Sequence, residues 1–151
     1  MTAFKYDHVH LRSPNPEETA VWYETMFGAE VLRSTQSDGK KRVDLNLGGM
    51  TVFIAPIMSK DGTGAPPESP YLGLEHIGLR VEGIDAAVAE LKRKGAEFTM
   101  EPTTVRPGVR IAFLRGPAEC QHRDSRPQRD VIRSTIRLEP DRTNPRSRIC
   151  A

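Results

Sequence analysis

The chain has 151 residues, enough for one domain with a sizeable core. Its net charge is only +2, and its arginines gather towards the C-terminus, so a basic stripe of the kind that binds nucleic acid is not indicated. There is no apolar run that could span a bilayer and no signal-peptide stretch, so we expect a cytoplasmic protein that binds neither nucleic acid nor membrane. The two cysteines, Cys120 and Cys150, define neither a disulfide framework nor a zinc motif.

The first part of the chain predicts a strand, a helix and three more strands. Apolar and polar residues alternate over residues 5–13, with His8, His10 and Arg12 on the polar side. A helix should span residues 15–28, which begin with an asparagine N-cap and end with a glycine. The three further strands are expected at 29–36, 41–48 and 50–57.

A second series of elements follows a linker at 58–72, which is rich in Gly, Pro and Ser. Residues 74–82 alternate like the first strand. A helix should come next, because Ile84, Val88 and Leu91 are spaced at i, i+4 and i+7. Two further strands are expected at 97–104 and 108–115.

The two series are copies of one βαβββ unit. Residues 7–12 and 75–80 both read acidic–His–β-branched–x–Leu–Arg, which places His8 and His76 at equivalent positions. A Gly-Ala-Glu block, followed by an apolar residue, begins at Gly28 and again at Gly95. Two matching blocks in the same order, with nearly the same spacing, indicate an internal repeat.

The pattern breaks after residue 117, where the last strand of the second repeat should begin. Residues 118–151 contain no Phe, Tyr, Trp, Gly or Lys, and arginine and proline recur. We therefore expect a domain over residues 1–117, with repeats at about 4–57 and 73–117, and a disordered tail after it. The last strand would then be missing or replaced.

A frameshift is one explanation for this break. Codons can be chosen for residues 119–126 so that reading one base later gives Asn-Val-Ser-Ile-Glu-Ile-Leu. That segment is an alternating strand with one carboxylate, which is the element that the repeat lacks. We favour a frameshift over a genuine tail, and codons in the encoding DNA that forbid the second reading would exclude it.

Several motifs resemble the vicinal oxygen chelate superfamily of glyoxalases, dioxygenases and bleomycin-resistance proteins. The resemblance covers residues 4–117 and implies an α+β fold in which two βαβββ repeats form curled mixed sheets around a cup. It also implies a small-molecule substrate and a homodimer, since homodimers are common in the superfamily. The motifs are Asp7-His8-Val9, Trp22-Tyr23, Met26-Phe27-Gly28-Ala29-Glu30, Glu75-His76-Ile77-Gly78-Leu79-Arg80-Val81 and Ala112-Phe113-Leu114-Arg115-Gly116-Pro117.

The resemblance further implies a divalent metal ion in the cup, namely Fe²⁺, Ni²⁺, Zn²⁺ or Mn²⁺. His8 and His76 match the ligands on the first strand of each repeat. The ligand on the fourth strand would fall at or beside Val52, where residues 51–55 offer no carboxylate or amide. The usual last-strand Glu is absent, although the frame-shifted reading would supply it, so the intended site resembles a triad of two His and one Glu. Nothing positions the metal-competent tail residues Glu119 and His122.

Other polar residues are candidates for substrate contact. His10 shares a face with His8 and would contact substrate or a ligand, or simply face solvent. Arg12 and Arg80 recur in the repeat and would bind a carboxylate or phosphate, or pair with nearby carboxylates. Three more candidates share the polar side of the expected strand at 41–48, which either lines the cup or faces solvent: Arg42, Asp44 and Asn46.

Two classes of function stay open. The first is a metal-dependent enzyme acting on a small oxygenated substrate, either a lyase or isomerase of the lactoylglutathione lyase type or an extradiol dioxygenase. A lyase or isomerase also needs a carboxylate base, and Val52 counts against a standard glyoxalase mechanism. The second is a metal-free binding protein of the bleomycin-resistance type. Without its last strand, the chain should bind metal weakly, have low activity and associate through an unpaired strand edge.

Overall fold

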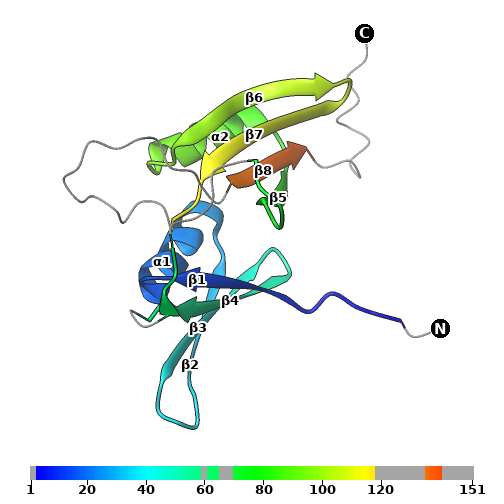
Figure 1. Cartoon of the computed structure of the whole chain (residues 1–151). Helices are drawn as coiled ribbons and strands as arrows, with labels where there is room; N and C mark the ends of the chain where they lie inside the picture. Colours follow the sequence, from blue (N-terminus) through cyan, green and yellow to red (C-terminus); the bar gives the residue numbers. More distant parts are fainter. Residues whose placement is uncertain (1–2, 59–60, 65–69, 118–134, 141–151) are drawn as a thin grey trace. The chain divides into compact units, whose positions relative to one another are not determined.

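The computed structural model describes residues 3–58, 61–64, 70–117 and 135–140 of the chain. The chain divides into two compact units, Met1–Gly64 and Ala65–Ala151, and each carries one copy of the repeat. In the described residues, each unit consists of one helix and one four-stranded mixed sheet (Figure 1). The fold is therefore α+β and built from βαβββ units, as the repeat predicts.

The first unit contains the elements expected from the first part of the sequence. Its sheet, called sheet A here, has the order β1-β4-β3-β2, in which β1 and β4 are parallel and the other neighbours are antiparallel. Each element lies within its expected range and is only a few residues shorter than that range. The bounds are β1 (His8–Ser13), α1 (Pro16–Phe27), β2 (Glu30–Thr35), β3 (Lys41–Leu47) and β4 (Met50–Pro56).

One face of sheet A is apolar and packs against α1. Leu45 on β3 and Val52 on β4 are fully buried, and Ile54 is nearly so. Tyr23 is one of the buried residues of α1. Its burial raises the pKa of its hydroxyl to about 12 because the charged form loses its hydration. Since side chains alternate along a strand, the polar residues of β1, β3 and β4 project from the opposite face.

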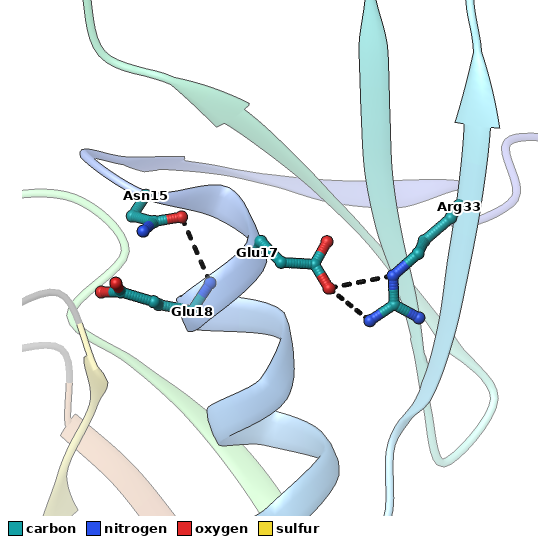
Figure 2. Close-up of polar contacts among 4 residues, drawn as sticks. All are labelled: Asn15, Glu17, Glu18 and Arg33. Atoms are coloured by element: carbon teal, nitrogen blue, oxygen red, sulfur yellow. Dashed lines mark hydrogen bonds and ion pairs between the residues drawn. The ribbon is translucent and has the colours of Figure 1, made fainter.

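Helix α1 is fixed at both ends by residues that the sequence singles out. The Asn15 side-chain oxygen accepts a hydrogen bond from the backbone N–H of Glu18 at 3.3 Å, as an N-cap residue does (Figure 2). The helix ends at Gly28, whose φ of 67° is left-handed and therefore suits glycine. Glu17 accepts a hydrogen bond from Arg33 Nε at 2.9 Å, which ties the first turn of the helix to β2.

The second unit repeats this arrangement. Its sheet, sheet B, has the order β5-β8-β7-β6, with β5 and β8 parallel. Helix α2 buries Ile84, Val88 and Leu91, the three residues that predicted it. The bounds are β5 (His76–Val81), α2 (Ile84–Arg93), β6 (Phe98–Arg106), β7 (Val109–Arg115) and β8 (Thr135–Pro140).

Strand β8 corrects the expectation for the end of the chain. It comes from the segment expected to be disordered, and it pairs with β5 on one side and with β7 on the other. The last strand is therefore replaced rather than missing, and neither β5 nor β7 is left with the unpaired edge that we expected. Sequence reasoning missed it because the alternation of Ile136 and Leu138 is short and surrounded by arginine and proline. Four residues considered above lie outside the described part of the chain: Glu119, Cys120, His122 and Cys150.

Candidate metal and substrate site

His8 lies on the polar face of sheet A, and two neighbours fix its ring. Its Nδ1 is 2.5 Å from a carboxylate oxygen of Asp7, the residue just before it. Its ring stacks on Phe53 of β4, with the centroids 4.1 Å apart and the planes at 28°. The side chain is 36% exposed, so the imidazole remains accessible while both contacts hold it.

His76 has a similar environment in the second unit. Its Nδ1 is 3.6 Å from a carboxylate oxygen of Glu75, again the preceding residue. Its ring meets Phe113 of β7 edge-on, with centroids 5.5 Å apart. Both histidines of the repeat therefore pair Nδ1 with the preceding carboxylate and contact a phenylalanine on another strand of the same sheet.

The surroundings of each imidazole, taken within its own unit, are compatible with metal binding. A metal-binding histidine commonly uses one ring nitrogen for the ion and donates the other N–H to a carboxylate or carbonyl, which fixes its tautomer and orientation. Nδ1 of His8 is at hydrogen-bond distance from Asp7, so Nε2 is the nitrogen that this ring can offer. Nδ1 of His76 lies 3.6 Å from Glu75, within ion-pair range but beyond a hydrogen bond. Imidazole suits the divalent transition metals expected from the sequence.

The residues in register with these histidines on the neighbouring strands are threonines in both units. Thr51 of β4 pairs in register with His8, and Phe53 occupies the next position on that face. Val52 itself lies in the core, so a ligand at Val52 could not reach His8, and only the positions beside it could. In the second unit, Thr135 of β8 pairs in register with His76. Within the described ranges, no three His, Cys, Asp or Glu side chains gather as a metal site, so the donor set fits a metal through its histidines but is incomplete.

The three candidates on β3 share the face of His8. Asp44 pairs in register with Phe53, and Asn46 pairs with Thr51, so their side chains project from the same side of sheet A. The register therefore puts these three candidates on the histidine-bearing face of sheet A. Whether this face lines a cup remains a prediction.

The polar residues on this face differ in how they are held. Arg42 Nε donates to Asp44 at 2.6 Å; the Asp44 side chain is mostly buried, and that of Arg42 is partly exposed. The Asn46 side chain donates a hydrogen bond to Glu30 at 3.3 Å and accepts one from the backbone N–H of Gly49 at 2.9 Å. Asn46 therefore supports the turn between β3 and β4. These contacts make Arg42 a stronger candidate for ligand contact than Asn46.

The remaining candidates lie on the first strand of each unit. His10 is 6.5 Å from His8 and 6.3 Å from Phe53 between ring centroids, so it belongs to the same cluster. Arg12 is exposed and donates to the backbone oxygen of Pro56 at 3.3 Å. Arg80 stands in register with Glu139 of β8.

Sequence reasoning did not identify Asp7, Glu75 or Phe53 as parts of the site. The acidic residues were visible in the repeated motif, and their position before each histidine was the available signal. Phe53 lies within residues 51–55, which offer no carboxylate or amide and so give no sequence signal for a site residue. Its role depends on which β4 residue lies beside His8, and that register cannot be read from local sequence.

Comparison with known proteins defines the class. The chain belongs to the Glyoxalase/Bleomycin resistance protein/Dioxygenase superfamily, whose family model matches residues 7–113. It is similar to the human (Homo sapiens) mitochondrial methylmalonyl-CoA epimerase, with 27% identity over 121 residues that cover 77% of this chain and 68% of the relative. The bovine (Bos taurus) epimerase is similar at 26% identity over 121 residues, covering 77% of this chain and 69% of that protein.

Solved structures agree on the fold. The fosfomycin resistance protein FosX from Listeria monocytogenes gives a TM-score of 0.64 at 14% identity, covering 98% of this chain and 100% of that one. A FosX variant complexed with Mn(II) and 1S,2S-dihydroxypropylphosphonic acid gives a TM-score of 0.58 at 15% identity, covering 91% and 90%. At this identity the likeness concerns the fold alone. Of the described helices, neither α1 nor α2 has the length and apolar character needed to cross a bilayer.

Proposed function

We propose that this chain is built as a metal-dependent isomerase that moves a proton next to the carbonyl group of a small oxygenated substrate. His8 and His76 would hold the divalent metal. Of the enzyme classes left open by the sequence, the isomerase is favoured over the dioxygenase because the two curated relatives are epimerases. The reaction of those relatives, on methylmalonyl-CoA, is the first to test.

The observation that carries this proposal is the repeated carboxylate–histidine pair. Asp7 and Glu75 both face Nδ1 of the histidine that follows them. A carboxylate that accepts a hydrogen bond from Nδ1–H would leave Nε2 as the metal-binding nitrogen; Asp7 is at hydrogen-bond distance from His8, and Glu75 lies somewhat further from His76, at 3.6 Å. The same device in both copies of the repeat is difficult to explain by chance contact on a strand.

The chain's own residues would divide the remaining work. When bound, a divalent metal would supply Lewis-acid stabilisation of the negative charge that develops on the substrate carbonyl oxygen. Phe53 would shield one face of His8 from water, because the two rings stack at 4.1 Å. No residue is assigned as the base, since proton abstraction needs a group within hydrogen-bond reach of the substrate carbon.

A metal-free binding protein is the second candidate, and the β4 residues favour it. Thr51 and Phe53 occupy the positions beside His8 where a carboxylate or amide ligand would otherwise be expected. With two imidazoles and, among the described residues, no cluster that adds a third ligand, we expect metal binding to be weak.

Metal titration separates the two candidates. Calorimetry with Mn²⁺, Ni²⁺, Zn²⁺ and, without oxygen, Fe²⁺ should detect one site in the wild type, and His8→Ala or His76→Ala should each abolish it. His10→Ala is the matched control, because this histidine lies on the same strand face as His8. If the wild type binds none of these ions, the isomerase proposal fails and the metal-free candidate stands.

The reaction class is tested by hydrogen exchange. The metal-loaded protein should exchange the α-hydrogen of methylmalonyl-CoA with deuterium from solvent, measured by NMR. Loss of exchange in both histidine variants, with exchange kept in Arg33→Lys, which lies outside the candidate site, would support the proposal. A metal-loaded wild type without exchange on this substrate would contradict the epimerase assignment while leaving the metal site intact.

A further inference from the structure

Arg42 is the most constrained arginine on the polar face of sheet A. Its Nε donates to Asp44 at 2.6 Å, and its Cζ lies 4.1 Å from the centroid of the Phe53 ring. The hydrogen bond and the contact with the aromatic ring together restrain the position of the guanidinium. The side chain is 35% exposed, so a group held in this way still reaches solvent.

The terminal nitrogens of Arg42 are not used by these contacts. Asp44 accepts a hydrogen bond from Nε alone. Neither Nη1 nor Nη2 of Arg42 has a hydrogen-bond partner among the described residues. Two other arginines use two nitrogens on one carboxylate, namely Arg33 on Glu17 and Arg110 on Asp85. Arg42 is therefore oriented by the protein while its terminal donors stay available.

Asp44 shows that this orientation is maintained at a cost. Its side chain is 16% exposed, and its second carboxylate oxygen, Oδ1, is buried without a hydrogen-bond partner among the residues that the structure describes. A buried ion pair with an unsatisfied oxygen contributes little to stability and often less than an apolar replacement. The pair is better explained by the position that it gives to Arg42.

Phe53 connects Arg42 to the histidine cluster. Strand β4 lies between β1 and β3, so Phe53 meets His8 from one neighbouring strand and Arg42 from the other. A ligand group bound by Arg42 would therefore lie on the same face of sheet A as His8 and His10. The Phe53 ring would separate that group from His8.

We propose that Arg42 binds the anionic group of a small ligand, a carboxylate or a phosphate-type oxyanion, on this face of sheet A. Nη1 and Nη2 donate to its oxygens, while Asp44 and Phe53 act as positioning residues. The inference rests on the proposed function, because it assigns the part of the substrate that is held beside the histidines. It assigns the substrate class as a small organic anion.

Anion titration without metal tests this proposal separately from the metal site. Malonate and inorganic phosphate are titrated into the full chain in chelator-treated buffer and followed by calorimetry and NMR. At least one of the two anions should bind saturably. The anion that binds more tightly identifies whether Arg42 prefers a carboxylate or a phosphate-type group. Arg42→Lys should weaken binding by about tenfold or more, since lysine keeps the charge but loses the planar fork. Arg33→Lys is the matched control and should leave the affinity unchanged.

The positioning role of Phe53 is tested by Phe53→Leu, which removes the ring without changing charge. Anion affinity should fall, and the Arg42 Nε–H signal should broaden as the guanidinium becomes disordered. Phe113→Leu removes the aromatic contact of His76 and should do neither, provided that both variants keep the wild-type circular dichroism. Absence of anion binding in the wild type, or full affinity in Arg42→Lys, overturns the inference; anion binding without metal binding overturns only the proposed isomerase.

Discussion

Two neighbouring residues of β4 should respond in opposite ways to the same substitution. Val52 lies in the core beneath α1 and is fully buried, whereas Phe53 faces His8 on the other side of sheet A. We predict that Val52→Glu prevents folding of the first unit. We predict that Phe53→Glu folds and gains affinity for a divalent metal.

The magnitudes follow from the two environments. Val52→Glu loses the burial of a valine, about 1.5–3 kcal/mol. A carboxylate in its place must take a proton through a pKa raised by about 3 units or more, at roughly 1.4 kcal/mol per unit. The sum, about 6 kcal/mol, matches the whole stability of many small domains.

Phe53→Glu is much milder. The variant loses the stack on His8, worth about 0.5–1.5 kcal/mol, and the contact with Arg42, worth about 0.5–1 kcal/mol. An ion pair between the new carboxylate and Arg42 returns up to about 1 kcal/mol. The new carboxylate lies beside His8, so metal affinity should rise by about tenfold or more.

Thermal melting followed by circular dichroism measures the first effect, and calorimetric titration with Mn²⁺ or Ni²⁺ measures the second. The double variant His8→Ala with Phe53→Glu should lose the gain in affinity, because the new ligand then lacks its partner. Equal melting temperatures for Val52→Glu and Phe53→Glu would refute the β4 register, and a gain that survives His8→Ala would refute the place of His8 in the site.

Three further predictions concern the orienting carboxylates, acid stability and β8. Asp7→Asn and Glu75→Gln should each weaken metal binding by about 10- to 100-fold in calorimetry without lowering the melting temperature, and unchanged affinity in both would contradict their orienting role. The hydrogen bond from Arg110 lowers the pKa of Asp85 below its ordinary value of 3.8. This pair therefore stabilises the protein fully at pH values above 3.8, and the contribution is lost as the pH falls through the lowered pKa. Asp85→Asn should therefore flatten the acid side of the melting-temperature profile, and identical acid slopes would speak against it. A chain ending at Pro117 lacks β8 and should associate through the exposed edges of β5 and β7, measured by light scattering after size exclusion; an unchanged particle mass would count against the edge argument.

The fold could be predicted from the sequence because its signals are local. Asn15 and Gly28 mark the ends of α1 by the chemistry of capping and of a left-handed backbone. The alternation in β3 predicted which side chains are buried, and Leu45 and Val43 are indeed in the core. The repeat carried these assignments into the second unit as far as β7.

The site was less accessible to sequence reasoning because its contacts join separate strands. Alternation was enough to put His8 and His10 on one face of β1. The contact of His8 with Phe53 depends on the parallel register of β1 against β4, which no local pattern encodes. For the same reason, the sequence drew attention to Val52, although the neighbouring residue is the one that meets the histidine.

Strand β8 shows why a sheet can close while its site stays incomplete. The space between β5 and β7 requires backbone hydrogen bonds and an alternating apolar pattern. Residues 135–140 meet this requirement, since Ile136 stands in register with Ile77 on one side and Leu114 on the other. Nothing in that requirement selects a carboxylate beside His76, and Thr135 occupies the position. Closure of sheet B and placement of the third ligand are therefore independent, so a shifted reading frame would remove the ligand and still leave a closed sheet.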